Sequence, residues 1–201
     1  KKKKGELTMR ILAIGAHPDD IEIACSGTLA KCVKRGDTVI VCHASSGNLG
    51  HVVIPPEELK IMRANEAKKA GSLAGIEVIW GGFDDLDIYE NNKKARDMMV
   101  DVIRYANPDL IITHDPDDYM PDHTSVSKLV FDAAFTATLP NYECTQKRFT
   151  KDDTPAKLVP IYYMDTLAGV NFNPTMYVDV SETIDLKIKM SALAIKNNYF
   201  E

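Results

Sequence analysis

Short apolar segments that alternate with amphipathic stretches are the feature that most limits the fold of this 201-residue chain. Apolar side chains occupy successive positions in these segments, as in strands that are buried on both faces of a parallel sheet. Strands are expected at 9–16, 38–44, 77–80, 110–113, 161–164 and 177–180, and helices at 27–34, 56–70, 93–106 and 125–138. Repeated strand–helix units of this kind predict an α/β fold: a Rossmann-like, doubly wound, mainly parallel sheet with helices on both faces.

Three residues mark helix boundaries in this pattern. Gly36 and Gly71 follow amphipathic stretches, and glycine often ends a helix because it adopts the left-handed conformation without strain. Ser181 precedes the last amphipathic stretch and is followed by Glu182. We therefore expect Ser181 to cap the final helix and Glu182 to lie in its first turn.

Composition excludes several classes of protein. The chain has 24 Lys and Arg against 29 Asp and Glu, a net charge of −5, whereas a general nucleic-acid-binding protein presents a basic face. It contains no apolar run of about 18 residues, so no membrane span is expected. The four cysteines form no CxxC pair, which favours free thiols and a cytoplasmic location. A homo-oligomer is compatible with the sequence.

The two ends differ from the rest of the chain. Residues 1–4 are all lysine, and we expect residues 1–8 to form a disordered basic tail or to be a remnant of expression. The remaining residues, 9–201, contain no linker or internal repeat and are expected to form one domain. The final helical pattern has no cap signal, so a C-terminal segment beyond residue 201 is expected to be missing.

Three of the five histidines lie in loops that follow predicted strands. His17 is in the loop after the first strand, and His114 and His123 follow the fourth. Because the carboxyl ends of parallel strands meet at one edge of the sheet, these loops are expected to converge. A site at this edge is the main functional prediction.

His17, Asp20 and His123 are candidates for a metal site, because imidazole and carboxylate groups together suit a divalent cation such as zinc. Asp19 and Asp20 are adjacent in a tight turn, so their carboxylates point in different directions; one can bind the metal while the other faces a reacting water. The alternative is that both aspartates cap the next helix and the histidines lie on a solvated rim.

The segment Ala16-His17-Pro18-Asp19-Asp20, together with Pro121-Asp122-His123, resembles the PIG-L/LmbE-like family of zinc-dependent N-deacetylases. This resemblance implies that His17, Asp20 and His123 bind zinc and that Asp19 is the general base. It also implies that the Asp122 carboxylate contacts a metal ligand without itself binding the metal. Fe²⁺ or another divalent metal is an alternative to Zn²⁺.

Two positions depart from the family pattern. Met120 occupies the place of a histidine that is thought to act as an acid or oxyanion donor, and a thioether can do neither. His114 or Asp118 could replace that histidine, or the Asp19 carboxyl could work alone. Asn48 stands where the family often has a glutamate.

The resemblance also implies residues that contact the substrate. Arg63, in an Arg-x-x-Glu pair with Glu66, is expected to reach towards the sugar, with a surface ion pair as the alternative. Asp85 resembles a loop acid that contacts sugar hydroxyls, and its alternative role is turn formation. Asn48 and Asp118 complete the predicted substrate-binding set.

These observations predict a metal-dependent hydrolase that removes an acetyl group from a small N-acetylated amino sugar or glycoconjugate. A metal-dependent hydratase or lyase on the same scaffold is one alternative, and a non-catalytic sugar-binding module is another. A small amino sugar is the expected partner, and no nucleic acid is expected.

Overall fold

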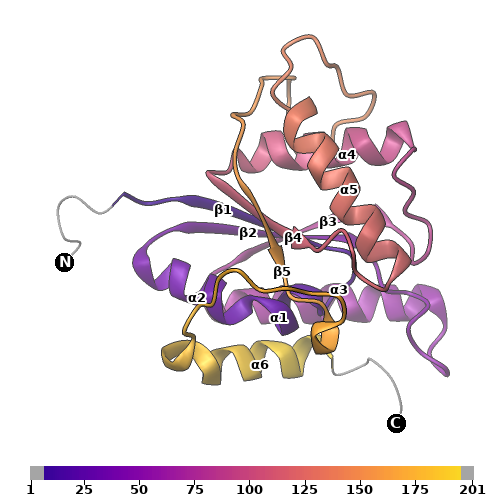
Figure 1. Ribbon diagram of the computed structural model, residues 1–201. Helices are drawn as coiled ribbons and strands as arrows, with labels where there is room; N and C mark the ends of the chain where they lie inside the picture. Colours follow the sequence, from indigo (N-terminus) through magenta and orange to yellow (C-terminus); the bar gives the residue numbers. More distant parts are fainter. Residues whose placement is uncertain (1–6, 196–201) are drawn as a thin grey trace.

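A five-stranded sheet in which all neighbouring strands are parallel forms the centre of the computed structural model, which describes residues 7–195 (Figure 1). The strand order is β3-β2-β1-β4-β5. The strands are β1 (Arg10–Gly15), β2 (Thr38–Ser45), β3 (Glu77–Phe83), β4 (Leu110–His114) and β5 (Ile161–Met164). The direction of winding reverses between β1 and β4, as the doubly wound prediction requires.

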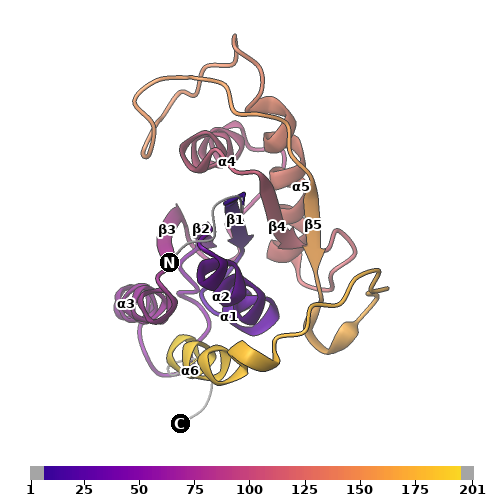
Figure 2. The same cartoon turned by 90° about the vertical axis from the view of Figure 1, so that its left-hand side faces the viewer.

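Helices cover both faces of the sheet, which confirms the predicted layers. They are α1 (Asp20–Ala24), α2 (Ser26–Arg35), α3 (Pro56–Ala74), α4 (Lys93–Ala106), α5 (Pro121–Thr136) and α6 (Ile184–Ala194), with 3-10 turns η1 (Leu167–Gly169) and η2 (Ser181–Thr183). Figure 2 shows α1, α2, α3 and α6 on one side of the sheet and α4 with α5 on the other. None of these helices is long and apolar enough to cross a membrane.

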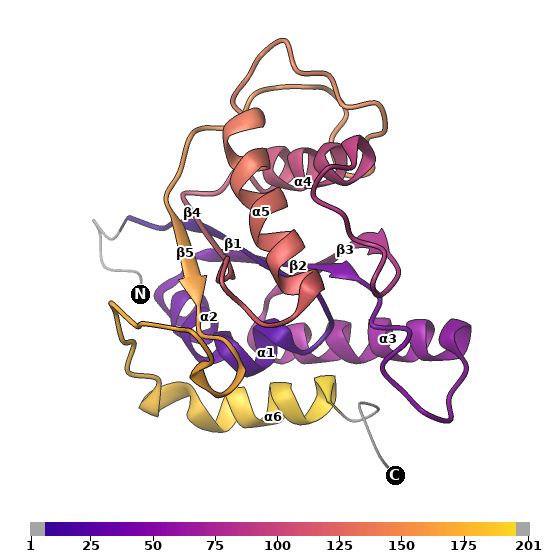
Figure 3. The same cartoon turned by 45° about the vertical axis from the view of Figure 1, so that its right-hand side comes forward.

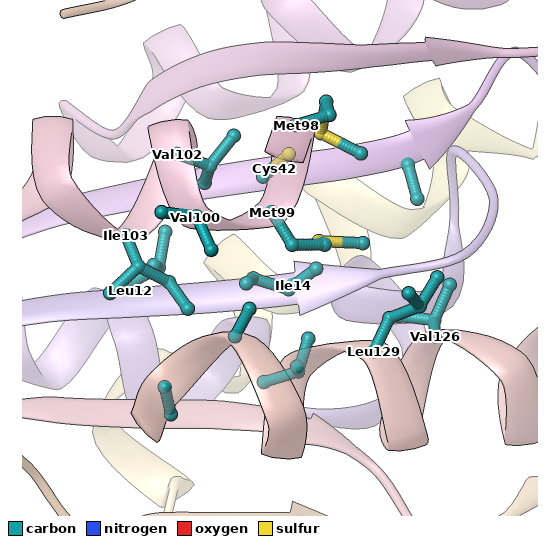
Figure 4. Packing of buried hydrophobic residues seen from close by; sticks show 14 of the residues in the cluster. Leu12, Ile14, Cys42, Met98, Met99, Val100, Val102, Ile103, Val126 and Leu129 are labelled. Atoms are coloured by element: carbon teal, nitrogen blue, oxygen red, sulfur yellow. The ribbon is translucent and has the colours of Figure 1, made fainter. Parts of the chain in front are cut away.

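Alternation along β1 divides the core into two layers. Leu12 and Ile14 pack with α4 and α5, where Met99 is fully buried (Figure 4). Ile11 and Ala13 face the opposite layer, beneath α1, α2, α3 and α6. Because both faces of β1 are buried, the strand is apolar at every one of these positions.

Several predicted boundaries were wrong. Helix α5 begins at Pro121 rather than residue 125, because proline is compatible with the first helical turn. Residues 177–180 form no strand; the segment instead crosses to α2, where Lys31 donates to the Asp179 carbonyl. The Ser181 hydroxyl donates to the side chain of Asp179 and caps no helix.

The prediction that Gly71 ends its helix was also wrong. Helix α3 continues to Ala74, and Gly75 follows it in the left-handed conformation at φ 71°. Gly71 instead lies where the helix contacts β3: a Cβ atom there would be 2.4 Å from Val78 Cγ2. Gly71 therefore allows helix and strand to pack closely. Residues 1–6 of the expected basic tail, and the chain end from 196 onward, lie outside the described residues.

We expect Gly71→Ala to destabilise the protein. In an exposed helix interior the same substitution ordinarily stabilises the helix by about 1 kcal/mol. Val78 is β-branched and cannot easily rotate away from the added methyl group. Urea denaturation should show a loss of about 1–3 kcal/mol, as is usual for overpacking. The double variant Gly71→Ala/Val78→Ala should recover much of it. A Gly71→Ala variant as stable as the wild type would contradict this account of the contact.

A long segment between α5 and β5, residues 139–160, has no helix or strand and is held by carboxylates of α4 (Figure 2). Asp97 accepts hydrogen bonds from Lys93, from the Tyr142 hydroxyl at 2.7 Å and from the backbone N–H of Thr145 at 3.0 Å. Asp101 accepts from three successive backbone N–H groups, those of residues 148–150. The two acids thus replace the hydrogen bonds that regular structure would supply.

Asp97→Asn should lower the free energy of unfolding by about 2 kcal/mol near neutral pH. Burial opposes ionisation of Asp97, but the donors around it, Lys93 and Thr145 foremost, lower its pKa to about 2. A carboxylate with a lowered pKa stabilises the folded state above its unfolded pKa, near 3.8, and this contribution disappears as the pH falls towards 2. Urea denaturation at several pH values should show the two proteins converging in acid. Asp165→Asn, at an exposed position, is the control.

Candidate metal centre and active site

The predicted site residues meet at the carboxyl ends of β1 and β4, where the winding of the sheet reverses. Figure 3 shows the loop after β4 passing close to the start of α1. The Ala16 backbone N–H donates to His114 Nε2 at 2.9 Å, which joins the two loops directly. Ligand sites of open parallel sheets lie in the crevice formed at such a reversal.

The carboxylate of Asp20 is the centre of the cluster. His114 Nε2 lies 3.1 Å from Asp20 Oδ2, His123 Nε2 lies 3.3 Å from Oδ1, and His17 Nδ1 lies 3.5 Å from Oδ2. Asp20 Oδ2 also accepts from the backbone N–H of His17 at 2.7 Å. Burial opposes ionisation of Asp20, but the surrounding imidazoles hold its pKa well below the usual value. A buried carboxylate therefore gathers three histidines: one from the turn after β1, one from the end of β4 and one from α5.

His17 is oriented by a second carboxylate on its far side. Its Nε2 lies 3.1 Å from Asp122 Oδ2 and 3.6 Å from Asp85 Oδ1. Asp122 Oδ2 also accepts from the backbone N–H of Leu86 at 2.9 Å, so Asp122 is itself fixed. Burial lowers the pKa of His17, but Asp122 and Asp20 outweigh burial and raise it to about 10. Carboxylates in this position commonly set the tautomer and ring direction of a ligating histidine.

His123 is held in the same way, from α5. Its Nδ1 lies 2.9 Å from Asp118 Oδ2, and its ring stacks on that of His114 with centroids 3.8 Å apart. Its Nε2 is buried and has no hydrogen-bond partner in the described part of the chain, although it faces Asp20. His114 is itself buried, and burial lowers its pKa, which favours a neutral ring.

Three of these groups fit a divalent metal. One ligand atom each from His17, Asp20 and His123 lies within 4.8 Å of the others. Nitrogen and carboxylate donors in this number are typical of a catalytic zinc site, which keeps a further position open. The unpartnered Nε2 of His123 is the atom that such an ion would satisfy. The predicted ligand set is thus brought together, and the residues fit the ion.

Asp19 lies beside this group and points elsewhere. Its backbone has φ 134°, a conformation that non-glycine residues rarely adopt, and it precedes α1. Its Oδ2 lies 3.4 Å from an Arg63 terminal nitrogen. Burial and the charge of Asp20 raise the pKa of Asp19 to about 7, while Arg63 opposes the rise. A carboxyl group with such a pKa can accept and return a proton near neutral pH.

Arg63 is buried in α3 and holds two loops by their backbone. It donates to the Pro18 carbonyl at 2.6 Å and to the Gly47 carbonyl at 2.8 Å. Gly47 has φ 64°, and a Cβ atom there would lie 1.9 Å from Arg63 Nη1. The loop after β2 therefore needs glycine to accommodate the arginine. The alternative of a surface ion pair does not describe this buried residue.

Asn48 and Asp85 contact each other and connect two neighbouring loops. Asn48 Oδ1 accepts from the Asp85 backbone N–H at 2.9 Å. The Asp85 carboxylate accepts from the Ser45 hydroxyl at 2.8 Å and from the Leu49 backbone N–H at 3.0 Å. The remaining Asp85 lone pairs face His17.

The sequence analysis did not assign Glu22, His43 or Ser45 to the site. His43 is fully buried on β2, and its Nδ1 lies 3.0 Å from the His17 carbonyl oxygen. Its parallel register partner on β1 is Gly15, at the carboxyl end of the strand. That register was the available signal, because it places His43 beside the metal-binding turn.

A hollow of the described surface lies away from this crevice. A space of about 840 Å³ lies along α5 and β5, lined by side chains that include Phe131, Phe135, Leu158 and Tyr163. None of the predicted site residues lines it. The clustered ionisable groups point instead to the β1–β4 crevice.

Fold and site together define a doubly wound α/β protein with a cluster of histidines and aspartates, a candidate metal centre, at the reversal of its sheet. The family profile described as "GlcNAc-PI de-N-acetylase" (PIG-L) matches residues 12–134, and the chain belongs to this family. The match contains both loops of the metal centre.

Curated relatives agree with this assignment, and solved structures share the fold. The 1D-myo-inositol 2-acetamido-2-deoxy-alpha-D-glucopyranoside deacetylase of Nocardioides sp. is 26% identical over 66% of this chain and 56% of its own length. The chain spans about half the length of these curated relatives, among them the mycothiol S-conjugate amidase of Streptomyces coelicolor. N,N'-diacetylchitobiose deacetylase from Pyrococcus horikoshii shares the fold with a TM-score of 0.81 at 23% identity, covering 96% of this chain and 72% of its own. GalB, the 4-carboxy-2-hydroxymuconate hydratase of Pseudomonas putida, has a TM-score of 0.79 at 20% identity, with coverage of 92% and 78%.

We expect Asp122→Asn to weaken zinc binding about 10- to 100-fold, the usual effect of removing a carboxylate that orients a ligating histidine. An amide can still occupy the space, but it cannot hold His17 Nε2 by charge. Competition with a chromophoric chelator measures the change. Asp117→Asn, at an exposed position of the loop before α5, should bind zinc like the wild type. Equal affinities in the wild type and Asp122→Asn would contradict the orienting role.

Proposed function

We propose that this chain is a metal-dependent N-deacetylase that removes the acetyl group of a small N-acetylated amino sugar or glycoconjugate. Membership of the PIG-L family supports the reaction, and the amino-sugar substrates named for its relatives support the substrate class. The observation that carries the proposal is the separation of two adjacent carboxylates. Asp20 faces three imidazoles, while Asp19 lies outside that group against Arg63.

His17, Asp20 and His123 would hold the metal, and we propose zinc as the ion. When bound, the ion supplies Lewis acidity for amide hydrolysis. Asp19 accepts a proton from the water that attacks the acetyl carbonyl carbon. As the carbon–nitrogen bond breaks, protonated Asp19 returns the proton to the departing amine. The products are acetate and the free amino sugar.

Other residues of the site are assigned by the atoms that remain available to a substrate. Arg63 and Asn48 use polar atoms to hold loops, and Asp118 holds His123, so we assign all three to positioning. Each Asp85 carboxylate oxygen accepts one hydrogen bond from the protein and keeps a second lone pair, so Asp85 is the strongest candidate to accept sugar hydroxyls. His114 is stacked and buried, and its Nε2 accepts from the Ala16 N–H, which favours joining β4 to the turn after β1 over proton transfer.

Asp19→Asn should lose at least about 100-fold in acetate release while zinc binding changes little. General-base catalysis commonly contributes about 10²- to 10⁴-fold, and asparagine cannot accept the proton. The assay follows acetate from N-acetylglucosamine, its inositol conjugate and diacetylchitobiose, with metal content measured on the same samples. His123→Ala should instead lose both metal and activity. Asp117→Asn should keep both.

The same assay separates the alternatives. Metal binding without acetate release from any N-acetylated compound would contradict the deacetylase proposal and favour the hydratase, a reaction for which GalB, of the same fold, is named. Sugar binding without metal or turnover would favour the binding module. Iron in place of zinc would change only the identity of the proposed ion.

The cysteines of the described residues are free, which supports a reducing, cytoplasmic location.

A further inference from the structure

The metal-binding turn is held from beneath by a buried pair of side chains, Glu22 and His43. His43 is 0% exposed and Glu22 is 2% exposed. His43 Nδ1 lies 3.0 Å from the His17 carbonyl oxygen. Because a carbonyl oxygen only accepts hydrogen bonds, Nδ1 carries the proton and donates it.

The opposite side of the His43 ring faces an acid. His43 Nε2 lies 3.5 Å from Glu22 Oε1, and the ring also contacts Trp80, with centroids 5.2 Å apart. Within the described residues, neither His43 Nε2 nor Glu22 Oε2 has a hydrogen-bond partner. His43 thus contacts the turn through Nδ1, and its Nε2 faces Glu22.

Stability alone is a poor explanation for such a pair. Taking two ionisable groups out of water costs free energy, and replacing a buried pair with apolar side chains of similar size is often neutral or stabilising. An apolar pair would fill the space between α1 and β2 equally well. It could not direct an N–H group at the His17 carbonyl.

The carbonyl belongs to His17, a residue whose backbone and side chain are both held by other residues of the site. The N–H of His17 donates to Asp20, its ring is held by Asp122, and its carbonyl accepts from His43. Two residues further on, Asp19 has φ 134°. Such a conformation is strained and persists only when the surroundings determine it strongly.

We propose that Glu22 and His43 are positioning residues that fix the His17 carbonyl, and with it the metal-binding turn, and so set the affinity of the metal site. The inference rests on the proposed metal dependence of the protein. It extends the site by one layer beneath the turn, through residues that touch neither metal nor substrate.

Zinc affinity and the visible absorption of the Co²⁺-loaded protein test this inference without reference to activity. His43→Leu removes the N–H donor and should weaken zinc binding about 10- to 100-fold, with an altered Co²⁺ spectrum. His43→Asn places an amide N–H near the position of Nδ1 and should bind zinc within about threefold of the wild type, an effect under 1 kcal/mol.

The double variant Glu22→Leu/His43→Leu separates positioning from stability. It leaves no unpaired buried charge, so its metal-free form should unfold at the wild-type temperature or above. Its zinc affinity should nevertheless stay as low as that of His43→Leu. Arg104→Leu breaks a buried pair with Asp153 far from the turn; it should lower the unfolding temperature and leave zinc affinity unchanged.

Two results would overturn the inference alone. One is zinc binding by His43→Leu within threefold of the wild type, and the other is recovery of wild-type affinity in the double variant, which would show that only an unpaired charge had mattered. A wild-type protein that binds no divalent metal would overturn the proposed function, and this inference with it.

Discussion

The carboxylate of Asp20 organises the site, because three histidines from two segments far apart in the sequence surround it. His17 lies in the same turn as Asp20, whereas His114 and His123 follow a strand almost one hundred residues later. Charged groups inside a protein are costly unless each has a partner. Asp20, Asp118 and Asp122 supply those partners, so the arrangement that suits a metal ion is also the arrangement in which the buried charges compensate one another.

The same principle governs the rest of the polar interior. Two consecutive carbonyls of the turn, those of His17 and Pro18, are held by His43 and Arg63 from β2 and α3. On the opposite side of the molecule, Asp97 and Asp101 hold a segment that has no regular hydrogen bonds of its own. In each case a buried side chain supplies what backbone pairing does not. The apolar layers on either face of the sheet provide the rigid support for both.

Much of this could be predicted from the sequence. Strands such as 38–44 and 161–164 are short, apolar and bounded by turns, and their parallel order places the His17 and His123 loops at one edge. The family resemblance supplied the proposed division of roles between Asp19 and Asp20, which stays a prediction. Features that depend on contacts between distant residues could not be predicted: Gly71 resembles a helix end until Val78 is placed against it, and 177–180 resembles a strand although no sheet edge lies beside it. His43 lies in an apolar strand, and only the register of β1 and β2 reveals its contact with the turn.

The separation of the two ligand loops along the chain has a consequence for how the protein matures. Strand β4 must return past β2 and β3 to pair with β1 before His123 can reach Asp20. Contacts between residues so far apart form slowly, because the entropy of closing the intervening chain must be overcome first. A nascent chain that ends before β4 therefore holds only His17 and Asp20 of the centre, too few ligands to retain an ion firmly. Loading of the proposed metal would then report that β4 has paired with β1, and it would not require β5.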